Sequence, residues 1–116
     1  MTDMDLRYKR EFPDMEIESE ILNFLATENF MDTSWHNDAM PSFWNEAEGL
    51  CVWVDYPEDE REKSECPSNI EYMRFFVSET DEDGAYIEGE ELNTNSWEEV
   101  KIFIELYIYG GNKFRR

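Results

Sequence analysis

The fold is decided by the stretch Leu50–Tyr56, which reads Leu-Cys-Val-Trp-Val-Asp-Tyr. This apolar run is short and rich in β-branched and aromatic residues, which is typical of a strand and not of a helix. We therefore predict that Leu50–Tyr56 is the central strand of a sheet.

Further strands are expected after this run. Ile70–Ser78 alternates between two faces, with Met73, Phe75 and Val77 on one and Tyr72, Arg74 and Phe76 on the other. Thr80–Gly84 carries a turn signal, and Ala85–Leu92 is predicted as the next strand. Two weaker strand candidates precede the central run: Met31–His36 and Ser42–Glu46.

A helix is expected before the strands, over Asp14–Glu28. Its apolar residues recur at helical spacing: Ile17, Ile21, Phe24 and Leu25. Pro13 suits the first turn, and the acids that follow it suit the positive end of the helix dipole. Asn29 can adopt the left-handed conformation that ends a helix, with Phe30 closing over the end.

A second helix is expected after the strands, and a capping box marks its start. We expect the Ser96 hydroxyl to accept from the Glu99 amide and the Glu99 side chain to reach back to Ser96. Its apolar face contains Val100, Phe103, Ile104 and Tyr107, widened by Ile102 and Leu106. Gly110-Gly111 ends it.

This order of elements predicts an α+β fold. The simplest arrangement is an antiparallel sheet of three to five strands, with the N-terminal and C-terminal helices packed on one face. The length of 116 residues fits a single compact acidic domain over residues 1–116. Within it we expect an N-terminal arm at residues 1–12 and an exposed acidic loop at residues 57–68.

The charge is strongly negative and unevenly distributed. The chain has 29 acidic and 10 basic side chains, for a formal net charge of −19. Residues 11–112 contain 27 acids and four bases, a net −23, because six bases lie near the two ends. Such self-repulsion opposes compaction. With 41% hydrophobic and 16% aromatic residues, however, the chain is predicted to fold and not to be disordered.

The same composition excludes several classes. The sequence has no run of about 18 apolar residues, so we expect no membrane span, and the acidic N-terminus lacks the apolar core of a secretory signal. Two cysteines, Cys51 and Cys66, imply no disulfide framework, which favours a reducing cytoplasm. Direct binding of nucleic acid or of an anionic membrane surface is disfavoured by the sign of the charge.

Two patterns suggest a small enzyme or a metal-binding domain. His36, Asp38 and Cys51 can be arranged as a catalytic triad on paper, but the sequence has no nucleophile elbow, and Cys51 lies inside an apolar run. The segment from Glu79 to Glu90 matches the spacing of a calcium loop, yet strands and not helices flank it. We therefore expect no catalytic residues, no metal and no cofactor.

The acids themselves are the candidate site. A protein rich in carboxylates can reproduce part of the charge pattern of duplex DNA, which has one charge per about 1.7 Å of axis. One patch lies in the expected loop, at Asp59, Glu60 and Glu62, and another at the expected hairpin, at Glu79, Asp81, Glu82, Asp83, Glu88 and Glu90. Trp44, Tyr56 and Tyr86 are candidate aromatic anchors. The competing interpretation is that the charge serves solubility alone.

In size and charge, over the whole chain, the sequence resembles the small acidic inhibitors of host defence that phages and mobile elements encode, such as anti-CRISPR and antirestriction proteins that mimic DNA. It also resembles bacterial immunity proteins that neutralise nuclease toxins. No motif supports either resemblance, so no residue role is carried over.

The resemblance implies a non-enzymatic inhibitor in the host cytoplasm, whose partner is a basic protein or nucleoprotein complex. Its mechanism would be steric and electrostatic competition with DNA or RNA. The alternatives are an immunity protein bound to a nuclease toxin and, from another class, the small enzyme or metal-binding domain.

Overall fold

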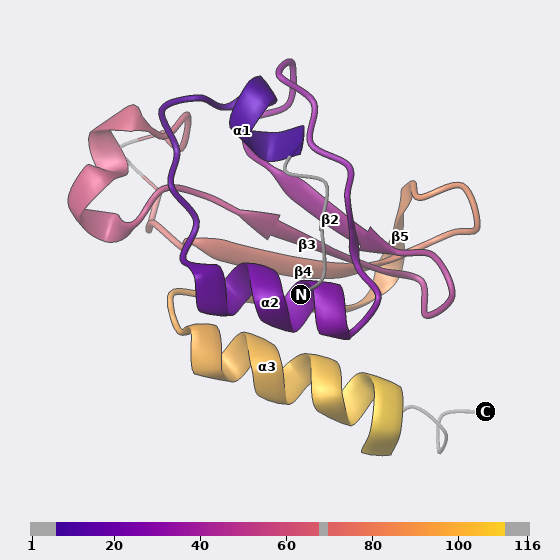
Figure 1. Ribbon diagram of the computed structural model, residues 1–116. Coiled ribbons are helices and arrows are strands. Elements are labelled where there is room, and N and C mark those ends of the chain that lie inside the picture. The colour runs from indigo at the N-terminus through magenta and orange to yellow at the C-terminus, as the bar shows by residue number, and fades with distance from the viewer. Residues whose placement is uncertain (1–6, 68–69, 111–116) are drawn as a thin grey trace.

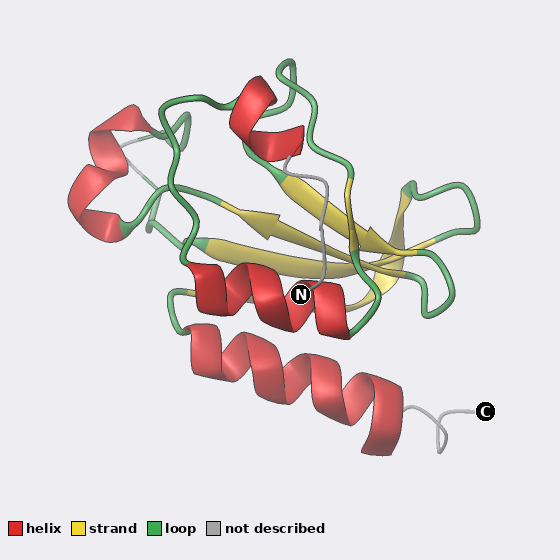
Figure 2. Ribbon diagram, in the orientation of Figure 1, coloured by secondary structure: helices red, strands yellow, loops and turns green. Residues whose placement is uncertain are grey.

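The computed structural model describes residues 7–67 and 70–110 (Figure 1). The elements in chain order are α1 (Arg7–Glu11), α2 (Ser19–Thr27), β1 (Met31–Asp32), β2 (Ser42–Asn45), β3 (Leu50–Val54), the 3₁₀ helix η1 (Glu58–Lys63), β4 (Phe75–Thr80), β5 (Tyr86–Thr94), α3 (Trp97–Glu105) and the π-helical turn η2 (Leu106–Gly110). Figure 2 shows the strands gathered into one sheet with the helices outside it. The predicted α+β class is confirmed.

The sheet is an antiparallel meander in the order β1-β2-β3-β4-β5. The predicted run therefore supplies the central strand, β3. Phe43, Val52, Val77 and Leu92 stand opposite one another across β2 to β5. Because side chains alternate along a strand, these four share one face of the sheet.

The hydrophobic core lies on that face. One buried cluster unites strand residues such as Val52 and Val77 with Ile21 and Leu25 of α2 and with Val100, Ile104 and Tyr107 at the C-terminal end. Figure 1 shows α2 and α3 running side by side along the sheet. Part of the expected N-terminal arm also joins this cluster, because Tyr8 of α1 is buried against Phe43.

The first predicted helix begins later than expected, at Ser19 instead of Asp14. Met15 and Ile17 are buried while their neighbours are exposed, which is the alternation of an extended segment. The Ile17 amide donates to the Tyr8 hydroxyl (3.1 Å), a tertiary bond that replaces a helical one. The predicted helix end is confirmed, since Asn29 has a φ of 70°.

The strand predicted over Ile70–Ser78 is also shorter, because β4 begins at Phe75. Ahead of it, the Asn95 side chain accepts from the Arg74 amide (2.8 Å) and donates to the Tyr72 carbonyl (2.8 Å). These bonds replace a strand ladder. The predicted alternation fails at Met73. Its side chain lies with that of Phe76 along one open surface depression, and not on the face of Phe75.

Three smaller expectations need correction. The expected loop at residues 57–68 contains η1. In α3 the Ser96 hydroxyl accepts from the Glu99 amide as predicted (3.2 Å), but the Glu99 carboxylate binds the Thr94 hydroxyl (2.5 Å) instead of reaching back to Ser96. Ile102 of α3 and Leu106 of η2 do not widen the buried face of the C-terminal helical segment, because both are exposed.

The described residues contain no helix with both the length and the apolar character needed to span a bilayer. Of the predicted helix stop, Gly110 ends η2, and Gly111 lies outside the described residues.

Candidate functional site

Carboxylates of the described residues gather at one end of the sheet. We call this surface the acidic hairpin, and it comprises Glu79, Asp81, Glu82, Asp83, Glu88, Glu90 and Glu91 on β4, β5 and their turn. From Phe75 to Val100 the chain has nine acids and no Lys or Arg. The negative field of the hairpin is therefore not neutralised by its own segment.

A bulge in β5 shapes one side of the acidic hairpin. Residues 87–90 of β5 lie opposite Glu79 alone, because the register shifts there. The Glu90 amide donates to the Glu79 carboxylate (3.1 Å), and a Cβ at Gly89 would come within 3.0 Å of that carboxylate. A bulge leaves residues unpaired and bends the strand. Glu79 thus supports the backbone of the bulge, whereas Glu88 is exposed.

The Asp81 carboxylate likewise binds backbone amides and so supports the turn between β4 and β5. Its Oδ1 accepts from the amides of Asp83 and Ala85, both at 2.9 Å. Gly84 completes the turn with a φ of 89°, in the region that favours glycine. Asp81 is therefore a structural residue, and the turn presents the carboxylates of Glu82 and Asp83, which are exposed, to solvent.

The second predicted patch, Asp59, Glu60 and Glu62, lies on η1. Figure 1 shows η1, the pink coil, and the β4–β5 hairpin at opposite ends of the sheet, so the two predicted patches do not form one surface. Bases also dilute the charge of η1: Lys63 lies 3.2 Å from the Glu60 carboxylate, and Arg61 donates to the Ile70 carbonyl (3.0 Å). The acidic hairpin is the stronger of the two patches.

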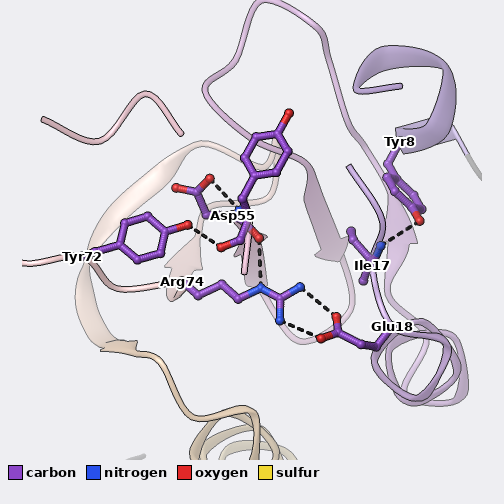
Figure 3. Close-up of polar contacts among 7 residues, drawn as sticks. Tyr8, Ile17, Glu18, Asp55, Tyr72 and Arg74 are labelled. Carbon is purple, nitrogen blue, oxygen red and sulfur yellow. Dashed lines mark hydrogen bonds and ion pairs between the residues drawn. The ribbon is translucent and has the colours of Figure 1, made fainter. Parts of the chain in front are cut away.

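The segment that connects β3 to β4 is anchored by buried polar groups (Figure 3). The buried carboxylate of Asp55 accepts from the Ser64 hydroxyl (2.7 Å) and from the Tyr56 amide (2.8 Å). The Tyr72 hydroxyl donates to the Tyr56 carbonyl. Because these bonds join both ends of the segment to the end of β3, they hold its position on the sheet.

Arg74 completes this anchor. Its side chain is only 9% exposed; Nη1 and Nη2 donate to the two carboxylate oxygens of Glu18 (2.9 and 2.8 Å), and Nε donates to the Asp55 carbonyl (3.0 Å). Figure 3 shows the paired, fork-like contact with Glu18. The hydrogen bonds from Arg74 lower the pKa of the Glu18 carboxyl below its usual value. The four-atom contact fixes the start of α2 against the start of β4.

The face of the sheet opposite the core carries an open groove of about 640 Å³, which we call the sheet groove. Trp53 and Phe76 stand opposite each other in the register and form its floor, and Tyr86 lies beside Phe76, with ring centroids 6.5 Å apart. The other lining residues are Met40, Asp55, Cys66, Ile70, Glu71, Met73 and Asn93. Two lining residues are acids and none is a base.

Sequence reasoning missed the sheet groove, although a signal was present. Val52 and Trp53 are adjacent, as are Phe76 and Val77, so in two paired strands both faces are apolar. One apolar face is used by the core, and no residue of α1, α2 or α3 lines the sheet groove on the other. Of the predicted anchors, Tyr86 is 55% exposed and belongs to the groove, whereas Trp44 is half-buried and donates to the Thr80 hydroxyl (2.9 Å). Tyr56 is half-buried.

The residues of the suggested triad are engaged in other ways. The His36 ring binds Glu11 (Nδ1 to Oε1, 2.6 Å) and contacts Trp35, and this bond lowers the pKa of the Glu11 carboxyl. Burial raises the pKa of the Cys51 thiol to about 12, so thiolate is scarce at neutral pH. Neither Cys51 nor Cys66 is in a disulfide.

The calcium-loop spacing falls on a β-hairpin, not on a loop between helices. Its carboxylates at Glu79 and Asp81 bind backbone amides, as described above. Over residues 7–67 and 70–110, no group of three or more His, Cys, Asp and Glu side chains is placed to hold a metal ion.

No protein-family model matches the sequence, and neither a curated protein nor a solved structure matches it. We therefore base the functional proposal on the acidic hairpin and the sheet groove.

Proposed function

We propose that this protein is a non-enzymatic inhibitor that binds a basic, nucleic-acid-binding surface of a host defence complex in the host cytoplasm. The observation that carries the proposal is the acidic hairpin, where seven carboxylates gather with no base between Phe75 and Val100. Closely spaced carboxylates carry charge of the same sign as phosphate groups. A basic surface that binds nucleic acid would therefore attract them as it attracts phosphate.

The size and charge of the whole molecule fit this role. Its longest dimension is 41 Å, and a duplex of that length carries about 24 phosphate charges. The formal charge of −19 is of the same order. A partner that binds DNA through Lys and Arg would be attracted to the chain by the same long-range field, and the attraction would weaken as salt rises.

The first experiment captures host proteins on the immobilised chain and elutes them with a 20-base-pair DNA duplex at constant ionic strength. We expect the duplex to release a protein that itself binds DNA or RNA. Added chain should then abolish the mobility shift of that purified protein on DNA. Retention that no duplex can reverse would contradict the proposal.

Matched variants test the surface. Glu82→Gln with Asp83→Asn removes two exposed charges from the acidic hairpin and leaves the Asp81 turn intact. We expect about a three- to tenfold loss of inhibition, from the usual contribution of charges at an interface. Glu20→Gln with Glu105→Gln removes two exposed charges from the helices and should change inhibition less than twofold. Equal effects of the two pairs would show that only net charge matters, and would refute the hairpin as the binding surface.

A further inference from the structure

The sheet groove is lined mainly by apolar and aromatic side chains, and binding through the carboxylates of the acidic hairpin would not use them. Its floor consists of the aromatic rings of Trp53, Phe76 and Tyr86, on three adjacent strands. Tyr86 and Ile70 are 55% and 53% exposed, so this apolar surface is open to solvent. A volume of about 640 Å³ lies within the range of about 300–1,000 Å³ typical of ligand sites.

The charged residues that line the groove, Asp55 and Glu71, are both acidic. Glu71 is exposed on the segment before β4, whereas the Asp55 carboxylate at the end of β3 is buried and already bound to Ser64 and the Tyr56 amide, so Glu71 is the lining acid that a ligand can reach. The Tyr86 hydroxyl donates to the Glu91 carboxylate (3.3 Å), which brings an acid of the hairpin to the rim. An aromatic floor with carboxylates at its edge attracts a cation and repels phosphate groups and acidic peptides.

We propose that the sheet groove receives an arginine side chain from a basic segment of the partner. The inference rests on the proposed function, and it names the side chain that the partner contributes. Of the two basic side chains, arginine fits better because its planar guanidinium stacks on aromatic rings and binds a carboxylate at the same time. Its apolar stem would lie along Met40, Met73 and Ile70.

The chain already makes this kind of contact twice with its own arginines. Arg61 lies over the Tyr72 ring at 5.1 Å, and Arg74 lies over the Phe75 ring at 5.0 Å while it binds the Glu18 carboxylate. Arg74 therefore shows, within this fold, a guanidinium that combines an aromatic face with a carboxylate. The groove offers the same two groups to an arginine from outside.

A second copy of the chain is a poorer occupant of the groove. Pairing two acid-rimmed faces would bring like charges together in molecules that each carry −19. Like charges that meet at an interface oppose association. A basic segment of a different protein has the complementary charge.

The test uses two peptides of equal charge, hexa-arginine and hexa-lysine, titrated into the full chain at low and moderate salt. We expect hexa-arginine to bind about two- to fivefold more tightly, which is the effect of a cation–π contact at a partly exposed site. In two-dimensional NMR, the indole N–H of Trp53 should shift with hexa-arginine and not with hexa-lysine. This measurement needs no variant, so it does not depend on whether a substitution folds.

Variants then locate the effect. Tyr86→Leu keeps an apolar side chain and removes the ring, and Glu71→Gln removes a rim charge; both should abolish the preference for hexa-arginine. The hairpin pair Glu82→Gln with Asp83→Asn should weaken both peptides equally and keep the preference. Glu20→Gln is the matched control for Glu71→Gln and should change neither affinity nor preference.

Equal affinity for the two peptides, with shifts confined to the acidic hairpin, would overturn the groove site and leave the proposed function standing. Failure of both peptides to bind at low salt would count against the groove and the proposed function together. Dimerisation of the chain that Tyr86→Leu abolishes would assign the groove to a second copy, and would also overturn the inference.

Discussion

Glu18→Gln tests the contact that joins the start of α2 to the start of β4. The two carboxylate oxygens of Glu18 accept from Nη1 and Nη2 of Arg74 at 2.9 and 2.8 Å. The Arg74 side chain is 9% exposed and that of Glu18 is 52% exposed. Gln at position 18 keeps one acceptor and removes the charge, so the arginine loses its ionic partner without a change of shape.

The expected magnitude follows from this geometry. Breaking a fully buried ion pair costs about 3–5 kcal/mol. Solvent reaches Glu18 and screens its charge, and Gln retains one hydrogen bond, so we reduce the cost to about 1.5 kcal/mol. For a domain of this size, that loss should lower the melting temperature by about 6 °C.

The effect depends on pH with a definite sign. Arg74 lowers the pKa of Glu18 in the folded state below its unfolded value of about 4.3. The stabilisation is therefore fully present above the unfolded pKa and is lost as the pH falls through the folded pKa. The difference between wild type and Glu18→Gln should be largest at pH 6–7 and should shrink toward zero as the solution is acidified below about pH 4.

Urea denaturation followed by tryptophan fluorescence measures this difference, because Trp97 packs against Phe24 of α2 and Phe75 of β4. Glu20→Gln, in the first turn of the same helix, is the control for the helix dipole and should cost less than about 0.5 kcal/mol. A loss below 0.5 kcal/mol for Glu18→Gln at pH 7, or a loss that is the same at pH 3, would refute the reasoning.

Three further predictions concern the hairpin, the cysteines and the cap of α3. Gly84→Ala should destabilise the fold by about 1–2 kcal/mol in thermal melts, because φ is 89° and a Cβ would touch the Trp44 ring at 3.4 Å; an unchanged melting temperature would contradict this. In the folded protein at pH 8, Ellman's reagent should modify Cys66 and leave Cys51 unmodified, because burial raises the pKa of Cys51 to about 12; equal rates would be inconsistent with a closed core. Ser96→Ala should cost about 1 kcal/mol in urea denaturation, through loss of the N-cap hydrogen bond, and Ser96→Thr should restore most of it.

The sequence predicted those features of the fold that depend on neighbours in the chain. The run at Leu50–Tyr56 indicated a strand, and it contains the central one, β3. Asn29 ends α2 with a positive φ, Gly84 turns the hairpin, and Ser96 caps α3. Each of these signals acts within a few residues, so it survives in the folded chain whatever packs around it.

The predicted starts of α2 and β4 were wrong, because residues that are distant in the chain decide where these elements begin. The pattern over Asp14–Glu28 is helical, yet the Tyr8 hydroxyl binds the Ile17 amide and Arg74 binds Glu18, 56 positions away in the chain. Periodicity measures only whether a segment can form a helix. It contains no information about a partner that competes for the first backbone donors.

The sequence by itself determined the sign of the molecule's own field, since 29 acids against 10 bases fix that sign whatever the fold. Only the tertiary structure decided which acids lie together. It placed the η1 acids and the acidic hairpin at opposite ends of the sheet, assigned Glu79 and Asp81 to backbone support, and opened the sheet groove beside the hairpin. The physical reason is that net charge is a sum over the chain and does not depend on the order of the residues. A binding surface, in contrast, needs side chains from several strands on one face, and strand pairing sets that arrangement.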